Sequence, residues 1–206
     1  MKDLGNNTRD IARELARKYS TMTHDELDVL ESILIPAKYS KGEMILREGE
    51  ICENIYYIER GLVRQFYFKN DKQITEHLGE EHSIFMCIES LFREKPTHLQ
   101  VEALEPTLVY MLPKRRLEVV ALQNVNIQIL YRKILEESLI ISQVHADLVR
   151  FESAQSRYKK MCKLWPQVVL RAPLVYIASY LQMTPETLSR VRAASLQDEL
   201  YDTDYK

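Results

Sequence analysis

The side chains best suited to chemistry lie in the segment 173–194, which reads PLVYIASYLQMTPETLSRVRAA. Helical spacing after Thr184 places Pro185, Glu186, Ser189, Arg190 and Ala193 on one face. An Arg on such a face can donate two hydrogen bonds to guanine, a Glu can accept from the amine of cytosine, and Ser or Thr can reach a phosphate or a base edge. The pattern suits a helix that enters the major groove of DNA, although a helical hairpin in an ordinary core has the same spacing.

Two short apolar segments must position this face. Ile177 and Leu181 stand four residues apart in the first segment, and Leu188 and Val191 stand three apart in the second. Each segment therefore has one apolar stripe, and we expect the two stripes to face each other. Ala178 is small enough to let two helices cross closely.

The second of these helices has a defined start. Thr184 is expected to be its N-cap, with Pro185 at the first helical position and Glu186 near the positive end of the helix dipole. The segment IASYLQMTPETLSRVR resembles the recognition motif of the cyclic-AMP receptor protein (Crp/Fnr) family of bacterial transcription regulators. SKGEMILREGE and NIYYIERGLVRQFYF resemble the effector barrel of that family, and SAQSRY followed by Trp-Pro resembles the approach to its DNA-binding domain.

The resemblance implies which residues contact DNA. By motif position, the residues expected to do so are Thr184, Glu186, Thr187, Ser189 and Arg190. Phosphate contacts are expected from Lys159, Lys160 and Arg192. The implied partners are double-stranded DNA with an inverted-repeat site, a second copy of the chain, and RNA polymerase.

Two features depart from the family pattern. Gln182 stands where the family usually has Gly in a left-handed turn, and a side chain there costs strain. After Ala194 only SLQDELYDTDYK remains. This acidic tail is too short for the two-stranded wing that many members add, so wing contacts to phosphate are not expected.

Composition sets broad limits on function. The 206 residues are 28% charged and 46% hydrophobic, which is ordinary for a globular protein. No stretch reaches the ~20 apolar residues that a membrane span needs, and the polar N-terminus does not resemble a secretory signal, so we expect a cytoplasmic protein. The net charge is -2, yet residues 150–194 hold eight Lys or Arg against two Glu. Phosphate attraction is local, so this basic segment can bind DNA although the rest of the chain is acidic.

The chain is expected to have three parts and an α+β fold. Residues 1–122 form an effector-sensing domain in which helices at Thr8 to Tyr19 and after Thr23 precede an antiparallel jelly-roll barrel. Turn signals about every 8 to 12 residues after Lys38 indicate the barrel's strands, with a hairpin through Lys69 to Lys72. Residues 123–150 form a long dimerisation helix, and residues 151–206 form a helix-turn-helix domain without a full wing.

The long helix carries a heptad pattern. Residues at a-type and d-type spacing are Ile127, Leu130, Ile134, Ile141, Val144 and Leu148. Such spacing favours a parallel homodimer, and a helix packed on its own barrel is the alternative. A two-fold dimer would present two recognition helices to major grooves about 34 Å apart.

The segment Ser83 to Gln100 corresponds by position to the family's phosphate-binding cassette. The candidate effector residues are Glu89, Ser90, Leu91 and His98. Cyclic AMP needs a Glu for the ribose and an Arg for the phosphate, but Ile88 stands at the usual Glu position and Thr97 to Gln100 contain no Arg. We therefore predict that cyclic AMP is not the effector, and we predict no cofactor.

No pattern indicates an enzyme or a metal site. The histidines at 24, 77, 82, 98 and 145 lack the spacing of a cupin-type metal centre, and Cys52, Cys87 and Cys162 lack ligand or disulfide spacing. The leading hypothesis is a homodimeric, sequence-specific transcription regulator. The second is a module that binds a cyclic nucleotide or another small ligand with vestigial DNA contact, and the third is a cupin-like enzyme.

Overall fold

Two short helices precede the first strand of the protein. The structure, a computed structural model, describes residues 8–203 and the side chains of residues 8–195. Helix α1 spans Thr8–Tyr19 and α2 spans His24–Ile33. Thr23 caps α2 in the predicted capping box, because its hydroxyl accepts from the N–H of Glu26 while the Glu26 carboxylate accepts from the N–H of Thr23. Both predicted helices are confirmed.

The strands form two antiparallel sheets of four strands each. One sheet has the order β1-β8-β3-β6 and the other has the order β2-β7-β4-β5. β1 includes Pro36 and begins earlier than the predicted Lys38; it is an edge strand, where a missing N–H is tolerated. The strands are β1 (Ile35–Tyr39), β2 (Met44–Leu46), β3 (Asn54–Arg60), β4 (Val63–Lys69), β5 (Lys72–Gly79), β6 (Ile84–Phe85), β7 (Gln100–Ala103) and β8 (Thr107–Pro113).

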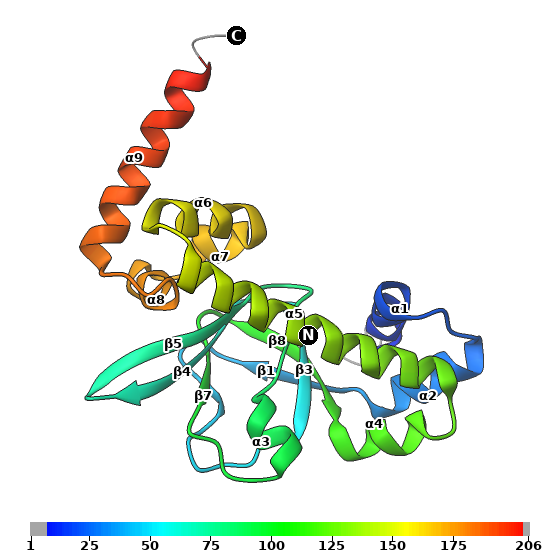
Figure 1. The fold of residues 1–206 in the computed structure, drawn as a ribbon. Helices are drawn as coiled ribbons and strands as arrows, with labels where there is room; N and C mark the ends of the chain where they lie inside the picture. The colour runs from blue at the N-terminus through cyan, green and yellow to red at the C-terminus, as the bar shows by residue number, and fades with distance from the viewer. Residues whose placement is uncertain (1–7, 204–206) are drawn as a thin grey trace.

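The β4–β5 hairpin is confirmed where its turn signals predicted it. Asn70 and Asp71 have φ values of 50° and 60°. Two successive left-handed residues make the turn whose twist matches the flanking strands, and Asn and Asp tolerate that conformation best among residues with a side chain. The hairpin projects beyond the sheets and reaches toward the C-terminal helices (Figure 1).

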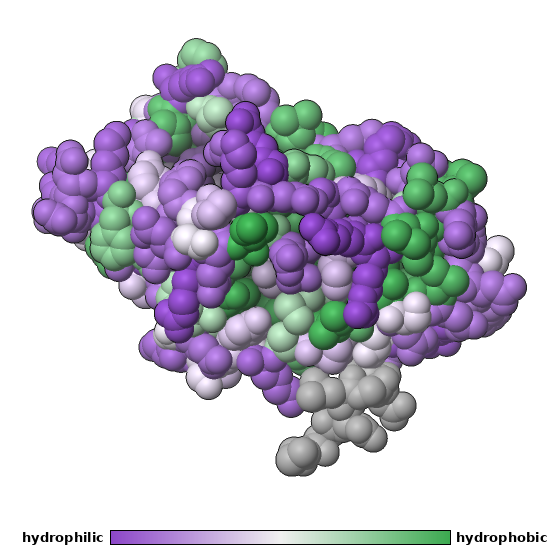
Figure 2. Space-filling model, turned by 90° about the horizontal axis from the view of Figure 1, so that it is seen from below, coloured by the Kyte–Doolittle hydropathy of each residue, from purple (hydrophilic) through white to green (hydrophobic). Residues whose placement is uncertain are grey.

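Two shorter helices flank the last strands. Helix α3 spans Ile88–Arg93 and α4 spans Lys114–Ala121. The apolar faces of both sheets, α1, α2 and α4 share one core, in which Ile55, Val109 and Leu117 are fully buried. Seen from below, the surface is mostly hydrophilic, with separate apolar groups among the polar side chains (Figure 2).

Helix α5 is the longest element and joins the two halves of the molecule. It spans Val125–Phe151, as predicted, and crosses from α1, α2 and α4 at one end to the C-terminal helices at the other (Figure 1). Its heptad residues, however, do not form an open seam. Ile127, Leu130 and Ile134 are buried in the core of their own chain.

The remaining heptad residues also point to three different surroundings. Ile141 is partly exposed and lines a cavity, Leu148 is buried against the C-terminal helices, and Val144 is exposed. The predicted seam is therefore wrong for the four buried residues, Ile127, Leu130, Ile134 and Leu148, and stays a prediction for Ile141 and Val144. The spacing had revealed a buried stripe, but the stripe packs on its own chain, which was the alternative interpretation.

Four helices follow α5 and surround a second apolar cluster. They are α6 (Ala154–Leu164), α7 (Pro166–Arg171), α8 (Leu174–Tyr180) and α9 (Pro185–Thr203). The cluster combines Val168, Ile177 and Leu188 with Leu78 from β5, so these helices pack on the sheets. Helix α9 extends away from the rest of the molecule (Figure 1). It continues to Thr203, so the described part of the tail expected to be too short for a wing is helical.

Candidate nucleic-acid interface and cavity

A tight turn fixes the angle between α8 and α9. The N–H of Met183 donates to the carbonyl of Ala178, and the N–H of Gln182 donates to the carbonyl of Ser179, both at 3.0 Å. Gln182 has a φ of 51°, so the turn is a Schellman motif with a left-handed residue at its centre. The sequence had predicted this conformation and its strain at Gln182.

Arg157 fastens the same turn from α6. Its guanidinium donates to the carbonyl of Leu181 at 2.6 Å and lies 3.4 Å from the carbonyl of Gln182. These carbonyls end α8, where a positive charge is favourable. In the sequence, Arg157 is one of several basic residues between 150 and 194. Its spacing from α8 does not indicate this structural role.

Helix α9 begins at Pro185, and Thr184 is its N-cap, as predicted. The Thr184 hydroxyl accepts from the N–H of Thr187 at 3.2 Å, and Arg190 donates to the hydroxyl of Thr187 at 3.3 Å. The two threonines are thus engaged within the helix. Leu188 is fully buried and Val191 packs against the same cluster, so the apolar stripe of α9 faces inward as predicted.

The opposite face of α9 is open to solvent. Glu186, Ser189 and Arg190 are all exposed on it. The pKa of Glu186 is lowered by its own backbone N–H, by the Thr184 hydroxyl and by nearby Arg190, so the carboxylate is ionised at neutral pH. A carboxylate acceptor and a guanidinium donor therefore stand side by side on an accessible helix.

Part of the positive charge near α9 is used inside the molecule. Arg171 pairs with Glu81 and, at 2.8 Å, with Glu105, so it holds α7 to the loops of the sheets. Lys160 pairs with Glu152 on its own side of the domain. Of the predicted phosphate contacts, Lys159, Lys160 and Arg192 are all exposed.

Helix α8 packs directly on the β4–β5 hairpin. The N–H of Thr75 donates to the hydroxyl of Ser179 at 2.9 Å, and the guanidinium of Arg64 lies 3.6 Å from the ring centre of Tyr176. Arg64 is fully buried and pairs with Glu102 at 3.0 Å, so its charge is compensated inside the sheet. Helix α8 is thus attached to the sheets through these polar contacts.

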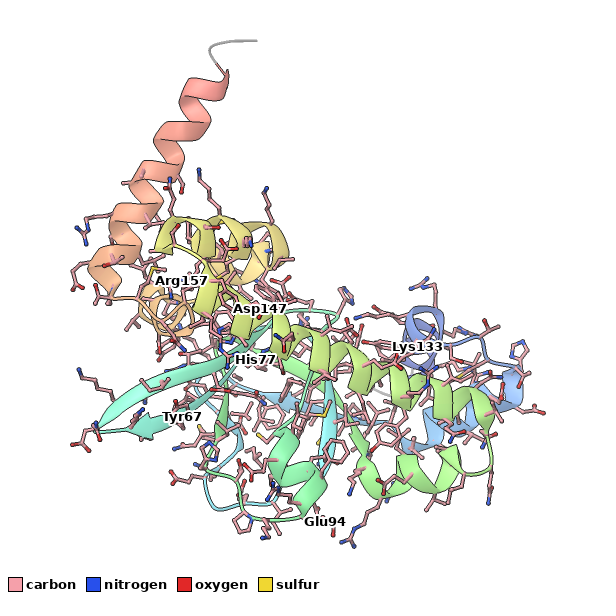
Figure 3. All side chains as sticks on the ribbon, in the orientation of Figure 1. Tyr67, His77, Glu94, Lys133, Asp147 and Arg157 are labelled. Carbon is pink, nitrogen blue, oxygen red and sulfur yellow. The ribbon has the colours of Figure 1, made fainter. Side chains whose placement is uncertain are left out.

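A cavity of about 400 Å³ lies where the sheets, α5 and α8 meet. Its wall comes from β4, β5, the segment from β6 to α3, the residues before β7, α5, and Tyr180 of α8. Figure 3 shows His77 on the hairpin close to where α5 crosses it, with Tyr67 further out. Because these segments are far apart in the sequence, no local pattern could have revealed the cavity.

Only part of the predicted effector segment reaches this cavity. Glu89 and His98 line it. Ser90 instead accepts from the N–H of Cys52 and donates to the carbonyl of Lys95, and Leu91 is buried in the main core. Ser90 and Leu91 therefore stabilise the fold, and their prediction as pocket residues is wrong.

Most of the other residues of the wall, among them two histidines and Tyr180, were not predicted. His77 and His145 line the cavity, and the His145 ring stacks on Tyr180 with ring centres 4.2 Å apart. His145 Nε2 donates to the Tyr180 carbonyl at 3.0 Å. Burial, followed by the nearby His145, lowers the pKa of His77 to about 4, so His77 is neutral at pH 7.

The histidines do not gather around a metal ion. His82 lies beside Glu14 of α1, at 2.7 Å, and beside the hydroxyl of Tyr57, whereas His77 faces the cavity. Within the part of the chain that the structure describes, no three His, Cys, Asp or Glu side chains are placed to share an ion. Across the same residues, no helix is both long and apolar enough to cross a membrane.

Comparison with known proteins first defines the class of the fold. Residues 36–124 match the family described as the cyclic nucleotide-binding domain. The structure of FixK2 from Bradyrhizobium japonicum superposes with a TM-score of 0.66 at 21% identity, covering 81% of this chain and 86% of that one. The catabolite activator protein of Thermus thermophilus superposes with a TM-score of 0.53 at 19% identity, covering 90% and 87%. The arrangement of sheets and helices is thus shared with these structures.

Two relatives extend the match to sequence. The anaerobic regulatory protein of Bacillus subtilis is 31% identical over 105 residues, which are 50% of this chain but only 44% of that protein. The transcriptional activator protein Anr of Pseudomonas protegens is 26% identical over 197 residues, covering 88% of this chain and 79% of that protein. The chain is thus similar to two regulatory proteins, and to the transcriptional activator Anr over most of its length.

Proposed function

We propose that this protein is a homodimeric regulator of transcription that binds DNA sequence-specifically through a helix-turn-helix formed by α8 and α9. In this proposal the two sheets are the family's jelly roll, and they serve as an effector domain. The observation that supports it best is α9, whose apolar stripe is buried while Glu186 and Arg190 are exposed on the other face. The names of the two sequence relatives agree with a regulatory role.

Selection of genomic DNA by the purified protein tests the proposal. We expect an inverted repeat, because a two-fold dimer presents two identical helices to successive major grooves. Recovery of no preferred sequence would count against sequence-specific regulation.

Arg190→Ala should then lose discrimination between the selected site and random DNA by about 1–3 kcal/mol, because a bidentate contact to guanine is removed. Lys159→Ala is the matched control, at a predicted phosphate contact on the same domain; it should weaken binding to all sequences alike and reduce the salt dependence. Competition binding at several salt concentrations measures both effects. Equal losses on specific and random DNA for Arg190→Ala would contradict a base contact.

The cavity favours a second candidate, a small-ligand binding module with weak DNA contact. Cyclic AMP does not fit it well, because the wall contains Glu76 and Glu89 but no Lys or Arg among the described residues. A cyclic phosphate held there would lack a charged partner. Calorimetric titration with cyclic AMP and cyclic GMP should give no heat of binding, while the DNA selection above still succeeds.

A further inference from the structure

The size and position of the cavity suit one small organic molecule. Its volume of about 400 Å³ is within the range of ligand pockets, and it lies between the sheets, α5 and α8. The apolar part of the wall comes from Phe85, Met86 and Leu99 on one side and Ile141 on the other. The cavity is open at its mouth, where Glu89, His98 and Ser142 are exposed, so a ligand would be covered on its inner side.

The charges of the wall disfavour an anion. Glu76 and Glu89 contribute carboxylates, and no Lys or Arg of the described residues lines the cavity. His77 is neutral at pH 7, because burial and His145 lower its pKa to about 4. An anionic ligand would be desolvated beside two like charges and would find no permanent positive charge to compensate it.

Ring-bearing side chains make up a large part of the wall. Six ring-bearing side chains contribute to it: Tyr67, His77, Phe85, His98, His145 and Tyr180. Two pairs among them already show aromatic geometry, since Tyr67 and His98 meet edge to face at 5.7 Å and His145 stacks on Tyr180. Aromatic molecules gain from such offset and edge contacts beyond the area that they bury.

One group in the wall lacks a partner. His77 Nε2 is buried and makes no hydrogen bond within the chain. A buried polar atom without a partner is costly, and a ligand's hydrogen-bonding group would remove that cost. The wall therefore favours a ligand that has an aromatic ring and a hydrogen-bonding group and that carries no negative charge.

We propose that this cavity binds an uncharged aromatic molecule carrying at least one hydrogen-bonding group, and that it discriminates against the anionic counterpart of the same molecule. The proposal rests on the proposed regulatory function, for which this ligand would be the effector. It assigns the chemical class of the ligand, which the match to a cyclic nucleotide-binding domain would not suggest. The ligand would touch Tyr180, which belongs to the helix pair proposed to bind DNA.

Matched pairs of compounds isolate the effect of charge. Full-length protein is titrated with three pairs of compounds, and binding is measured by saturation-transfer NMR. The pairs are benzamide with benzoate, indole with indole-3-acetate, and adenosine with cyclic AMP. We expect at least one uncharged member to bind and its anionic partner to bind at least tenfold more weakly. The proposal is overturned if no uncharged member binds, or if the anionic member of any pair binds as tightly as its partner.

Two variants locate the binding. Ser142→Trp fills the cavity from α5 and should abolish binding of the uncharged compound, while Ser32→Trp on exposed α2 should not. Glu89→Arg should reduce the ratio of the affinities for the uncharged and the anionic compound at least tenfold. Glu48→Arg, in an exposed turn outside the cavity, should leave that ratio unchanged. Circular dichroism checks folding, and Ser138→Trp is a second filling variant.

Binding that survives both filling variants would place the ligand elsewhere and overturn the assignment. The DNA selection is run without any ligand on the same preparation. If the DNA selection succeeds and the ligand titration fails, only the proposed ligand class is rejected. If the DNA selection fails, the regulatory function is rejected.

Discussion

Gln182 holds the backbone between α8 and α9 in a left-handed conformation that is unfavourable for a residue with a Cβ. Its φ of 51° lies where glycine has no penalty, and the two hydrogen bonds of the Schellman motif depend on it. Arg157 adds a further clamp on the neighbouring carbonyls. The surrounding contacts therefore enforce a backbone conformation that the residue itself disfavours.

Gln182→Gly should raise the free energy of unfolding by about 0.5–1 kcal/mol, because it removes the steric cost of the left-handed residue while the turn keeps its hydrogen bonds. Urea denaturation followed by circular dichroism should show a higher midpoint with an unchanged slope. Gln123→Gly is the matched control, since Gln123 is exposed after α4 and is not among the residues with positive φ. An equal or lower midpoint for Gln182→Gly would show that the turn is not strained.

At the scale of elements, α5 has three different environments along its length. Its first half is buried against the sheets and α1, its middle lines the cavity, and Leu148 packs on the C-terminal helices. A separate set of apolar side chains on α5 is uncovered. Leu139, Ile140 and Phe151 are 70%, 62% and 77% exposed, and Val144 is also accessible. These residues, of which only Val144 belongs to the predicted heptad seam, are available to a second copy of the chain.

Ile140→Glu should convert the proposed dimer into a monomer, because it places a charge in an apolar contact between two α5 helices. Sedimentation velocity measures the change in mass. Val119→Glu is the matched control, since Val119 on α4 is also apolar and exposed, at 59%. If Ile140→Glu remains a dimer, the interface lies on another surface; if wild-type protein is already a monomer, the dimer proposal fails.

The elements themselves were largely predictable, but their partners were not. The capping box at Thr23, the Asn70-Asp71 turn and the N-cap at Thr184 are local signals, and each element begins or turns where expected. A heptad shows which side chains share a face but not which surface covers that face. The cavity was predicted only in part for the same reason: the resemblance indicated Glu89 and His98, but His77, His145 and Tyr180 join them only after the sheets and helices have packed.

At the scale of the whole molecule, the C-terminal helices are docked on the sheets through charged and polar contacts. The carboxylates of Glu80, Glu81 and Glu105 surround the start and the end of α7: Glu80 accepts from the N–H of Val168, and the other two pair with Arg171. Burial works against the charge of Glu81, but hydrogen bonds from Arg171 and from the N–H of Gly61 outweigh it and lower its pKa to about 2. Docking is thus linked to the ionised form of Glu81.

Arg171→Gln should destabilise docking at pH 7 by about 1–2 kcal/mol, a value reduced for the partial exposure of the pair. The stabilisation from Glu81 is complete above its ordinary pKa of 4.5 and is lost as the pH falls through the folded value of about 2. The variant should therefore show a weaker loss of stability between pH 4.5 and 2 than the wild type.

Hydrogen exchange at α7 and α8 measures how firmly the C-terminal helices are docked. Thermal unfolding at several pH values measures how stability depends on the ionisation of Glu81. Arg132→Gln removes an exposed pair with Glu136 within α5 and serves as the control, for which neither quantity should change. Exchange at α7 that is identical in Arg171→Gln and wild type would show that the apolar contacts of Val168 and Leu78 suffice for docking.

The contact between Trp165 and Tyr180 gives the protein an optical reporter of its own. Trp165 is the single tryptophan of the chain, and its ring meets the ring of Tyr180 edge to face at 6.0 Å, while Tyr180 also forms part of the cavity wall. Any molecule that shifts Tyr180 on entering should alter the emission wavelength or intensity of this one fluorophore. Occupancy could then be followed in solution without a label, by light absorbed at a residue that does not itself line the cavity.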